Sequence, residues 1–394
     1  MIIAAAAIGF HNTASMFVLP VTEELGFSRG EFTFFRTIVI ILSAALMPLY
    51  GRLATNMSLK KLMLVGTTLN GLAMAAYSFG TALWHFYLIS VVSGFVVNAG
   101  NFLIIGILIS RWFEDKKGIA IGLAFAGSGL GAAIMNPMVS LVIQNFDWRF
   151  GFRFSGLASV IVLIPTILLL IKDTPEQMGL RPYRSKKDEE KAIASEPAGL
   201  SLYQARKTPI FWLLVLALVG LSVTAGAPKA HTAPYLGDLG YSAAVASAVV
   251  SLSMVFLTIG KVLMGYVYDR FGTITGGLVL GIFCILSPIF ALMAATNPAA
   301  PWLHAVFFGL ASTGFSMPVN IYAMKFFGQK DFPAILSALS VVIALGAALS
   351  PPLMGFSYDF LDSYSVAWIA LVIIGFAIVF SLTIADVLHR RQSK

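Results

Sequence analysis

Apolar residues fill long stretches of this chain, and polar residues gather in the short segments between them. A helix needs about 20 mainly apolar residues to cross a bilayer, and about twelve stretches reach that length. We place them near residues 1–21, 31–51, 60–81, 84–111, 117–144, 149–171, 209–234, 241–267, 274–296, 301–326, 331–357 and 363–388. The pattern predicts an all-α membrane protein with twelve transmembrane helices.

One connection is much longer and more polar than the others. Residues 172–208 are dense in charge and divide the predicted helices six and six. We therefore expect an N-terminal six-helix bundle over residues 1–171 and a C-terminal six-helix bundle over residues 209–394. The segment 172–208 is then a solvated linker loop with one surface helix.

The composition agrees with a membrane protein and excludes other classes. Hydrophobic residues make up 58% of the 394 positions and charged residues 11%, whereas soluble domains carry about 25% charged residues. The single cysteine, Cys284, lies in an apolar stretch, which excludes an internal disulfide and a cysteine-based metal site. The sequence has no phosphate-binding loop and no metal-ligand spacing. We therefore expect no cofactor, no metal, no enzymatic activity and no ATP-driven transport.

The chain begins inside its first predicted helix. Met1 leads directly into an apolar run that has no basic segment before it, so the pattern indicates no cleavable signal peptide. Because this run is short at its start, we expect that a few upstream residues are missing from this sequence.

Lysine and arginine are distributed unevenly between the two sets of loops. Of the 26, 20 lie in the central loop, the C-terminal tail and the loops on their side, three lie in the opposite loops, and three lie inside predicted helices. Cytoplasmic loops carry the excess of basic residues, so we expect both termini to be cytoplasmic, in the inner (plasma) membrane of the cell. The net charge of +8 is then a topology signal with contact to anionic lipids, and it does not indicate nucleic-acid binding.

The two halves of the chain match at a constant offset of 214 residues. The matching pairs include Pro20 and Pro234, Gly26 and Gly240, Ser28 and Ser242, Gly51 and Gly265, Arg111 and Lys325, Phe113 and Phe327, Pro137 and Pro351, and Phe146 and Phe360. Two parallel repeats of six helices joined by a cytoplasmic loop resemble the major facilitator superfamily. That resemblance implies two bundles that rock around a site near the middle of the membrane.

A loop motif strengthens this resemblance. After the eighth predicted helix, Gly265, Asp269, Arg270 and Gly272 form the pattern Gly-x-x-x-Asp-Arg-x-Gly, which is similar to the loop signature of the superfamily. The matching segment of the first half is degraded to Gly51, Thr55, Asn56 and Ser58. The resemblance implies that Asp269 and Arg270 act in gating at the bundle interface. A solvated turn is the alternative.

A finer resemblance lies in residues 111–137, RWFEDKKGIAIGLAFAGSGLGAAIMNP. Together with DTPEQMGL after the sixth predicted helix and KTPIFW before the seventh, it resembles the monocarboxylate transporter and oxalate/formate antiporter group. The same stretch contains Gly118, Gly122, Gly127, Gly129 and Gly131. Small residues let membrane helices approach closely, so we expect close helix packing here.

Lys261 lies inside an apolar stretch, where a lysine costs about 2.5–3.5 kcal/mol. It shares one helix face with Ser251, Met254, Thr258 and Gly265. Lys261 precedes Asp269 by eight residues, or about 12 Å of helix, and this distance favours a polar cavity over snorkelling. In the monocarboxylate/oxalate group an arginine at this place, in the pattern Arg-Pro-x-x-Gly, binds the substrate carboxylate. Here lysine keeps the charge but lacks the bidentate fork.

Other polar residues inside predicted helices are further candidates. The fourth helix has Asn98 and Asn101 on one face with Ser90 and Gly94, and the tenth has Asn320 and Tyr322 near Ser312 and Ser316. Their alternative role is hydrogen bonding between helices, worth about 0.6 kcal/mol each. His11, beside Asn12, can bind an anion or carry a proton, and its alternative role is a hydrogen bond to a neighbouring helix. Three basic residues either make an outer vestibule positive or extend their charged groups to the membrane surface: Arg36, Lys229 and His231. Three other histidines are expected at the membrane–water interfaces with no role: His85, His304 and His389.

The acidic residues are absent from the middle of every predicted helix, although the chain has 18 of them. A buried cation without a buried anion suggests that the substrate supplies the negative charge. Eukaryotic monocarboxylate transporters couple protons through a lysine in the first helix and an aspartate in the eighth, and Met16 and Leu257 hold those places here. Anion exchange, or proton coupling through His11 or Lys261, stays open.

These observations predict a secondary transporter of a small organic anion, a monocarboxylate or related carboxylate, working by alternating access as a symporter or antiporter. Its expected partners are that anion, a proton or counter-anion and the lipid bilayer, with the protein as a monomer. The alternatives are an exporter of hydrophobic or drug-like compounds with the same fold, and a membrane receptor that does not transport.

Overall fold

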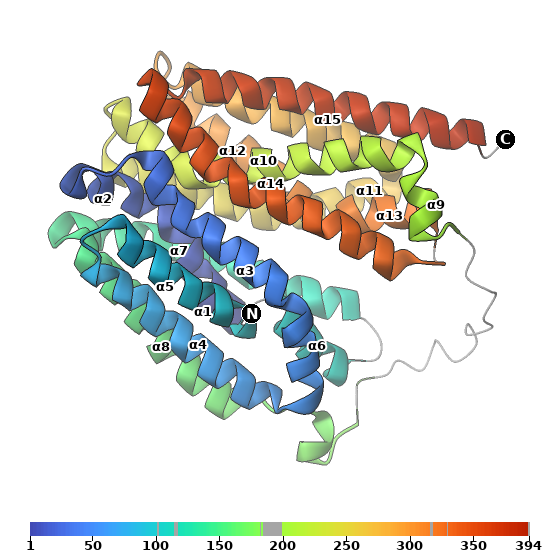
Figure 1. Ribbon diagram of the computed structural model, residues 1–394, viewed down its shortest axis with the longest axis horizontal. Coiled ribbons are helices and arrows are strands. Elements are labelled where there is room, and N and C mark those ends of the chain that lie inside the picture. Colours follow the sequence, from blue (N-terminus) through green and yellow to red (C-terminus); the bar gives the residue numbers. More distant parts are fainter. Residues whose placement is uncertain are drawn as a thin grey trace. The chain divides into compact units, whose positions relative to one another are not determined.

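The computed structural model describes residues 1–100, 102–113, 117–181, 183, 199–315, 318–328 and 330–392. Across these ranges the chain is helical, and its only extended pairings are two isolated bridges, Phe113 with Tyr183 and Gly199 with Gly328 (Figure 1). The expected all-α fold is therefore confirmed.

The first half contains the following elements. They are α1 (Ile2–Gly9), η1 (Phe10–Phe17), α2 (Val18–Leu25), α3 (Arg29–Asn56), α4 (Leu59–Ala76), η2 (Tyr77–Phe79), α5 (Leu83–Val96), η3 (Val97–Gly100), α6 (Phe102–Trp112), α7 (Lys117–Asn145), α8 (Trp148–Leu170) and η4 (Pro175–Met178), where η marks a 3₁₀ turn. The six expected helices correspond to α1–η1–α2, α3, α4–η2, α5–η3–α6, α7 and α8.

The second half follows the same plan. Its elements are α9 (Leu202–Arg206), α10 (Pro209–Asp238), α11 (Ala243–Met293), α12 (Ala300–Ala311), η5 (Ser312–Phe315), α13 (Pro318–Phe327), α14 (Phe332–Leu361) and α15 (Ser365–Gln392). The long α11 contains two expected helices, because its backbone leaves the helical region at Gly272. Ten helices within the described ranges are long and apolar enough to cross a membrane. With α11 divided and α12–η5–α13 counted, the structure agrees with the expected twelve-helix membrane fold.

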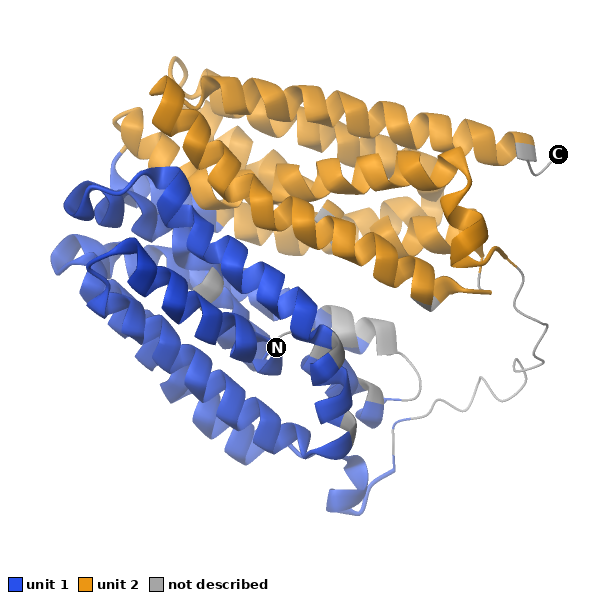
Figure 2. Ribbon diagram, in the orientation of Figure 1, with its two compact units in different colours: residues 1–193, 242–251 blue, residues 194–241, 252–394 orange. Residues whose placement is uncertain are grey.

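The chain divides into two compact units, shown in two colours in Figure 2. Unit 1 comprises Met1–Ile193 with Ser242–Ser251, and unit 2 comprises Ala194–Tyr241 with Leu252–Lys394. The expected bundle limits at residues 171 and 209 remain predictions. Each unit has its own apolar core: Leu59, Met63 and Ile104 are buried in unit 1, and Leu214, Leu280 and Leu339 in unit 2.

Local signals in the sequence explain where several helices begin and end. Ser28 starts α3 with a capping box, in which its hydroxyl accepts from the Glu31 backbone N–H at 3.1 Å and its own N–H donates to the Glu31 carboxylate at 3.3 Å. Gly26 ends α2 in the left-handed region at φ 69°. Gly272 breaks α11 at φ 81° and ψ 171°, a region that is essentially restricted to glycine.

Helices α1 and α7 pack closely through glycine, as the sequence predicts. A Cβ atom added to Gly131 would lie 2.3 Å from the carbonyl oxygen of Ala5, and one added to Gly127 would lie 2.3 Å from that of Met1. No side chain larger than hydrogen fits at either position without moving a helix backbone. Of the five glycines expected in close helix packing, Gly127 and Gly131 therefore each lie against the backbone of another segment.

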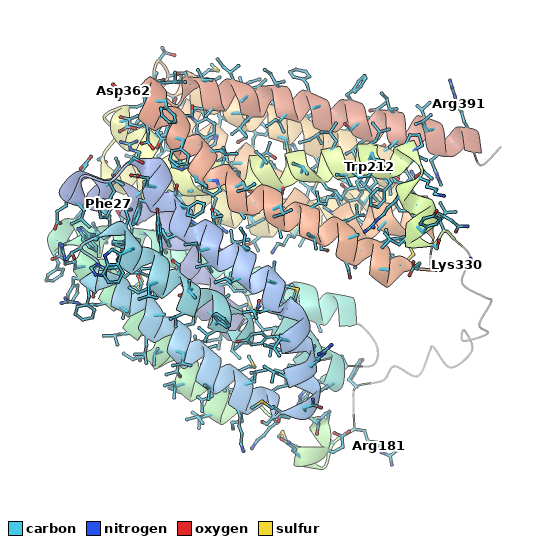
Figure 3. The ribbon with its side chains drawn as sticks, in the orientation of Figure 1. Phe27, Arg181, Trp212, Lys330, Asp362 and Arg391 are labelled. Carbon is cyan, nitrogen blue, oxygen red and sulfur yellow. The ribbon has the colours of Figure 1, made fainter. Side chains whose placement is uncertain are left out.

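The two ends of each unit differ in the residues that they carry. In unit 2, Lys330 and Arg391 lie at one end and Asp362 at the other, and in unit 1, Arg181 lies at the end opposite to Phe27 (Figure 3). Arg181, Lys330 and Arg391, which the sequence assigns to the basic side, thus each lie at one end of their unit.

Candidate functional site

Lys261 lies in unit 2, inside α11. Its side chain is half-buried, on the face that also carries Met254 and Tyr268, which are 1% and 6% exposed, whereas its neighbour Val262 is 77% exposed. The ammonium group makes no hydrogen bond or ion pair with any residue that the structure describes. Lys261 therefore places a cation on an inward face of its helix, where no described residue supplies an opposite charge.

The buried carboxylates are engaged elsewhere. Within the described ranges these are Asp173 in unit 1 and Asp386 in unit 2. Asp173 accepts from the backbone N–H of Lys60 at 2.7 Å. Asp386 pairs with Lys325 at 2.6 Å and with Arg390 at 2.7 Å. Neither of them is left to neutralise a cation in the middle of a helix.

The Asp386 cluster joins three helices at one end of unit 2. Lys325 of α13 donates both to Asp386 of α15 and to the hydroxyl of Thr273, which follows the break in α11. Tyr322, one turn before Lys325, donates to the carbonyl oxygen of Thr273 at 2.9 Å and is buried. The sequence predicts Tyr322 as a substrate-binding residue, whereas its hydroxyl bonds to the backbone beside the break at Gly272.

His231 of α10 is fully enclosed in unit 2. Its Nε2 lies 2.8 Å from the carbonyl oxygen of Pro351 on α14, and its Nδ1 lies 2.9 Å from the hydroxyl of Tyr364. A neutral imidazole satisfies both contacts by donating from Nε2 and accepting at Nδ1. The structure therefore supports a role in helix packing and leaves no snorkelling path, because the residue is 0% exposed. Its neighbour Lys229 is half-buried on the same helix.

His304 was expected at a membrane interface with no role, and the structure instead buries it inside unit 2. In the structure it is 2% exposed, with Nδ1 2.9 Å from the carbonyl oxygen of Ser287 and Nε2 3.2 Å from the hydroxyl of Thr232. The repeat could have identified it, because the offset of 214 residues places His304 on Ser90, a member of the predicted polar stripe.

Asn98 is buried in unit 1, at η3, where the fourth helix leaves α-helical geometry. It forms a reciprocal pair with Ser43 of α3: the Ser43 hydroxyl donates to Oδ1 at 3.0 Å, and Nδ2 donates to the Ser43 carbonyl oxygen at 2.7 Å. These contacts favour the interhelical role for Asn98. The other asparagine of the stripe, Asn101, lies outside the described residues.

The tenth helix repeats this irregularity. Its 3₁₀ turn η5 covers Ser312–Phe315, which overlaps the repeat image of η3. Ser312 donates to the carbonyl oxygen of Phe308 at 2.7 Å, and Asn320 is exposed on α13. Ser316 lies outside the described residues. Because mid-helix 3₁₀ turns often mark functional hinges, the two repeat-related turns identify the middle of these helices as candidate hinges.

The first helix also changes geometry near its predicted site. His11 and Asn12 fall in η1, and Asn12 is buried at 5% exposure. The side chain of His11 lies outside the described part of the structure, so its candidate role stays a prediction.

Arg36 lies in unit 1, on α3, with its side chain half-buried. Its Nη1 atom is enclosed and has no hydrogen-bond partner among the described residues. The phenol of Tyr77 lies within electrostatic range of this guanidinium. Arg36 therefore resembles Lys261 in being a cation without a described counter-charge.

The gating candidates lie where α11 changes direction. Gly265 is half-buried, whereas Asp269 and Arg270 are exposed and bond to no other described residue. Gly272 supplies the turn itself. The backbone requirement for Gly272 is thus shown, and the gating role of Asp269 and Arg270 remains a prediction. Within the described residues no cluster of His, Cys, Asp and Glu could hold a metal ion.

Comparison with known proteins identifies relatives of the whole chain. The chain matches the family model of the Major Facilitator Superfamily over residues 1–328 and 230–394. Monocarboxylate transporter 12 of Xenopus laevis is 22% identical over 371 residues, which cover 87% of this chain and 77% of that protein. Monocarboxylate transporter 11 of Homo sapiens is 25% identical over 361 residues, covering 88% and 73%.

A bacterial relative and two solved structures complete the comparison. The oxalate:formate antiporter of Oxalobacter formigenes is 27% identical over 213 residues, covering 54% of this chain and 46% of that protein. The crystal structure of the nucleoside transporter NupG aligns with a TM-score of 0.73 at 14% identity, over 98% of this chain and 97% of that one. A bacterial homologue of the human lysosomal transporter Spinster aligns with a TM-score of 0.68 at 14% identity, over 98% and 94%. These two likenesses show the fold alone.

Proposed function

We propose that the chain, because it belongs to the Major Facilitator Superfamily, is a secondary transporter that moves a small organic anion by alternating access. The anion we propose is a monocarboxylate or a related carboxylate. The names of the relatives support this class, since they include monocarboxylate transporters and an oxalate:formate antiporter.

The observation that carries the proposal is the charge state of the interior. Lys261 holds a cation on an inward face of α11, and the two buried carboxylates of the described ranges are already engaged at helix ends. An embedded cation without a protein counter-charge is costly, and a substrate carboxylate would remove that cost. This makes the anion the missing half of an ion pair.

The remaining candidate residues are proposed to assist this pairing or to hold the helices that carry it. His11, Asn101 and Asn320 are proposed to donate hydrogen bonds to the substrate. Lys229 gathers anions by its charge. Asn98, His231 and Tyr322 have protein partners that account for their polar atoms, so we propose that they hold the helices that carry the site.

The transport cycle that we propose follows the topology. The termini and the loop 172–208 face the cytoplasm, in the plasma or inner membrane, and Asp269 and Arg270 act in gating at that side. The protein works as a monomer. A proton or a second anion supplies the coupling, as symport or antiport.

Uptake into proteoliposomes tests the proposal. Purified protein should take up at least one labelled carboxylate among formate, acetate, lactate and oxalate. Lys261→Ala should reduce that uptake to background at substrate concentrations near the wild-type KM, because a hydrogen bond to a charged group is worth about 1.5–3 kcal/mol, or about 10- to 150-fold in affinity. Lys261→Arg, which keeps the charge, should retain part of it.

The matched control is Lys330→Ala, which makes the same chemical change at an exposed position. That variant should transport normally. Normal carboxylate uptake by folded Lys261→Ala protein would show that the substrate does not pair with this lysine.

A further inference from the structure

We propose that Arg36, Tyr77 and Ser93 form a second carboxylate-binding station, located entirely within unit 1. The inference rests on the proposed function, since it assigns the station to the same class of anion. It adds a binding group with different geometry from Lys261, and it includes two hydroxyl residues, Tyr77 and Ser93, for which the sequence predicts no role.

The station lies where three elements of unit 1 meet. Arg36 follows the start of α3 by seven residues, or about 10 Å of helix. Tyr77 belongs to η2 and Ser93 to α5. Helices α3 and α5 pack closely here, because a Cβ atom on Gly94 would lie 2.7 Å from the Leu42 Cβ atom. Arg36 and Ser93 each lie within interaction range of the Tyr77 phenol, so the fold places both beside the same ring.

The hydrogen bonds around Tyr77 leave donors unused. Ser90 donates to the carbonyl oxygen of Phe86 at 2.7 Å, so the Tyr77 hydroxyl donates to Ser90, also at 2.7 Å. Ser93 is 1% exposed and faces the same phenol, yet its hydroxyl has no hydrogen-bond partner of normal geometry in the described structure. A buried hydroxyl without a partner is unfavourable.

Arg36 adds an uncompensated positive charge to this cluster. Its Nη1 is enclosed without a partner. The carboxylates described in unit 1 lie at the helix ends: Glu24 pairs with Arg149, Glu31 closes the α3 capping box, and Asp173 accepts from Lys60. None of them reaches Arg36. The cluster thus offers donors from two side chains and no anion of its own.

The surroundings make an anion contact strong. The ring of Phe35 lies 5.3 Å from that of Tyr77, and the ring of Phe86 stacks on Tyr77 at 5.9 Å. Phe86 is 0% exposed. Aromatic walls of this kind lower the local dielectric and strengthen a charge-assisted hydrogen bond.

The guanidinium determines the preferred ligand. Its planar fork matches the two oxygens of a carboxylate, which a lysine ammonium cannot do. The Ser93 hydroxyl can donate to one of the same oxygens. The station is therefore selective for a planar carboxylate, whereas Lys261 binds by charge alone. This restores within unit 1 the bidentate geometry that unit 2 lacks at Lys261.

The test compares Arg36→Gln, Arg36→Lys and Ser93→Ala in proteoliposomes and in detergent. The probes are formate, acetate, lactate and oxalate. Arg36→Gln should raise the KM of the transported carboxylate at least tenfold, Arg36→Lys should raise it less, and Ser93→Ala should raise it severalfold. Arg391→Gln, the same change at an exposed helix end, should leave the KM unchanged.

Thermal unfolding separates this inference from the proposed function. A carboxylate should raise the unfolding temperature of the wild type but not that of Arg36→Gln, and without ligand Arg36→Gln should be at least as stable as the wild type. If the wild type transports no carboxylate but still shows the Arg36-dependent shift, the station stands and the transport proposal fails. An unchanged KM and an unchanged shift in Arg36→Gln overturn the station, as does a variant that is destabilised without ligand, because that identifies a structural arginine.

Discussion

Gly131 offers a direct measure of how tightly α1 and α7 pack. A Cβ atom at this position would lie 2.3 Å from the Ala5 carbonyl oxygen and 2.6 Å from the Ala5 Cα. Ordinary contacts between such atoms are about 3.5 Å, so Gly131→Ala must push the two backbones about 1 Å apart. Overpacking of this kind costs about 1–3 kcal/mol, and membrane helices depend on close packing for their association.

Gly106→Ala is the matched control. It makes the same change within helix α6, where an added Cβ atom would meet nothing within 4 Å. Both substitutions gain the helix preference of alanine over glycine, about 1 kcal/mol, so this gain cancels in the comparison. Gly131→Ala should therefore be less stable than Gly106→Ala by about 1–3 kcal/mol.

The assay is unfolding of both variants in mixed detergent and SDS micelles, followed by circular dichroism. The free energy of unfolding is compared at the same SDS fraction. Equal stability of the two variants would refute the reasoning, because it would mean that α1 does not contact α7 through Gly131.

Two further predictions concern unit 2 and use the same unfolding assay. Asp386→Asn should destabilise the protein by about 3 kcal/mol, since it removes one partner of a buried ion pair. Adding Lys325→Met should recover most of the loss. A double variant no more stable than Asp386→Asn would contradict this account of the pair. Gly272→Ala should cost about 1–3 kcal/mol because φ is 81° and ψ is 171° there; a stability equal to that of Gly106→Ala would show that this backbone geometry is not required.

The sequence predicted the helices well because length and apolar content are local properties. The break at Gly272 was anticipated by the loop motif, and the close approach at Gly127 and Gly131 by the glycines themselves. The irregular turns η3 and η5 were not predicted, since no single residue at either place enforces 3₁₀ geometry.

The candidate site was harder to predict than the fold. A polar residue in an apolar helix has the same local pattern whether it binds a ligand or a neighbouring helix. His231 and Asn98 illustrate this, because their partners lie 120 and 55 residues away in the sequence. His304 was overlooked because it lies near a helix end, and its burial depends on Thr232 and Ser287 from two other helices.

The sequence by itself determined that this chain is a twelve-helix membrane protein of two related halves, and that its interior carries more positive than negative charge. These conclusions need only hydropathy, spacing and the repeat. Only the tertiary structure decided which polar atoms are already satisfied: Asn98 by Ser43, His231 by Tyr364, and Asp386 by Lys325. The physical reason is that a hydrogen bond or an ion pair depends on distances between segments that are remote in the chain. For the same reason, the hypothesis from the sequence that Lys261 has no protein counter-charge needed the structure, in which neither Lys261 nor Arg36 pairs with a described carboxylate.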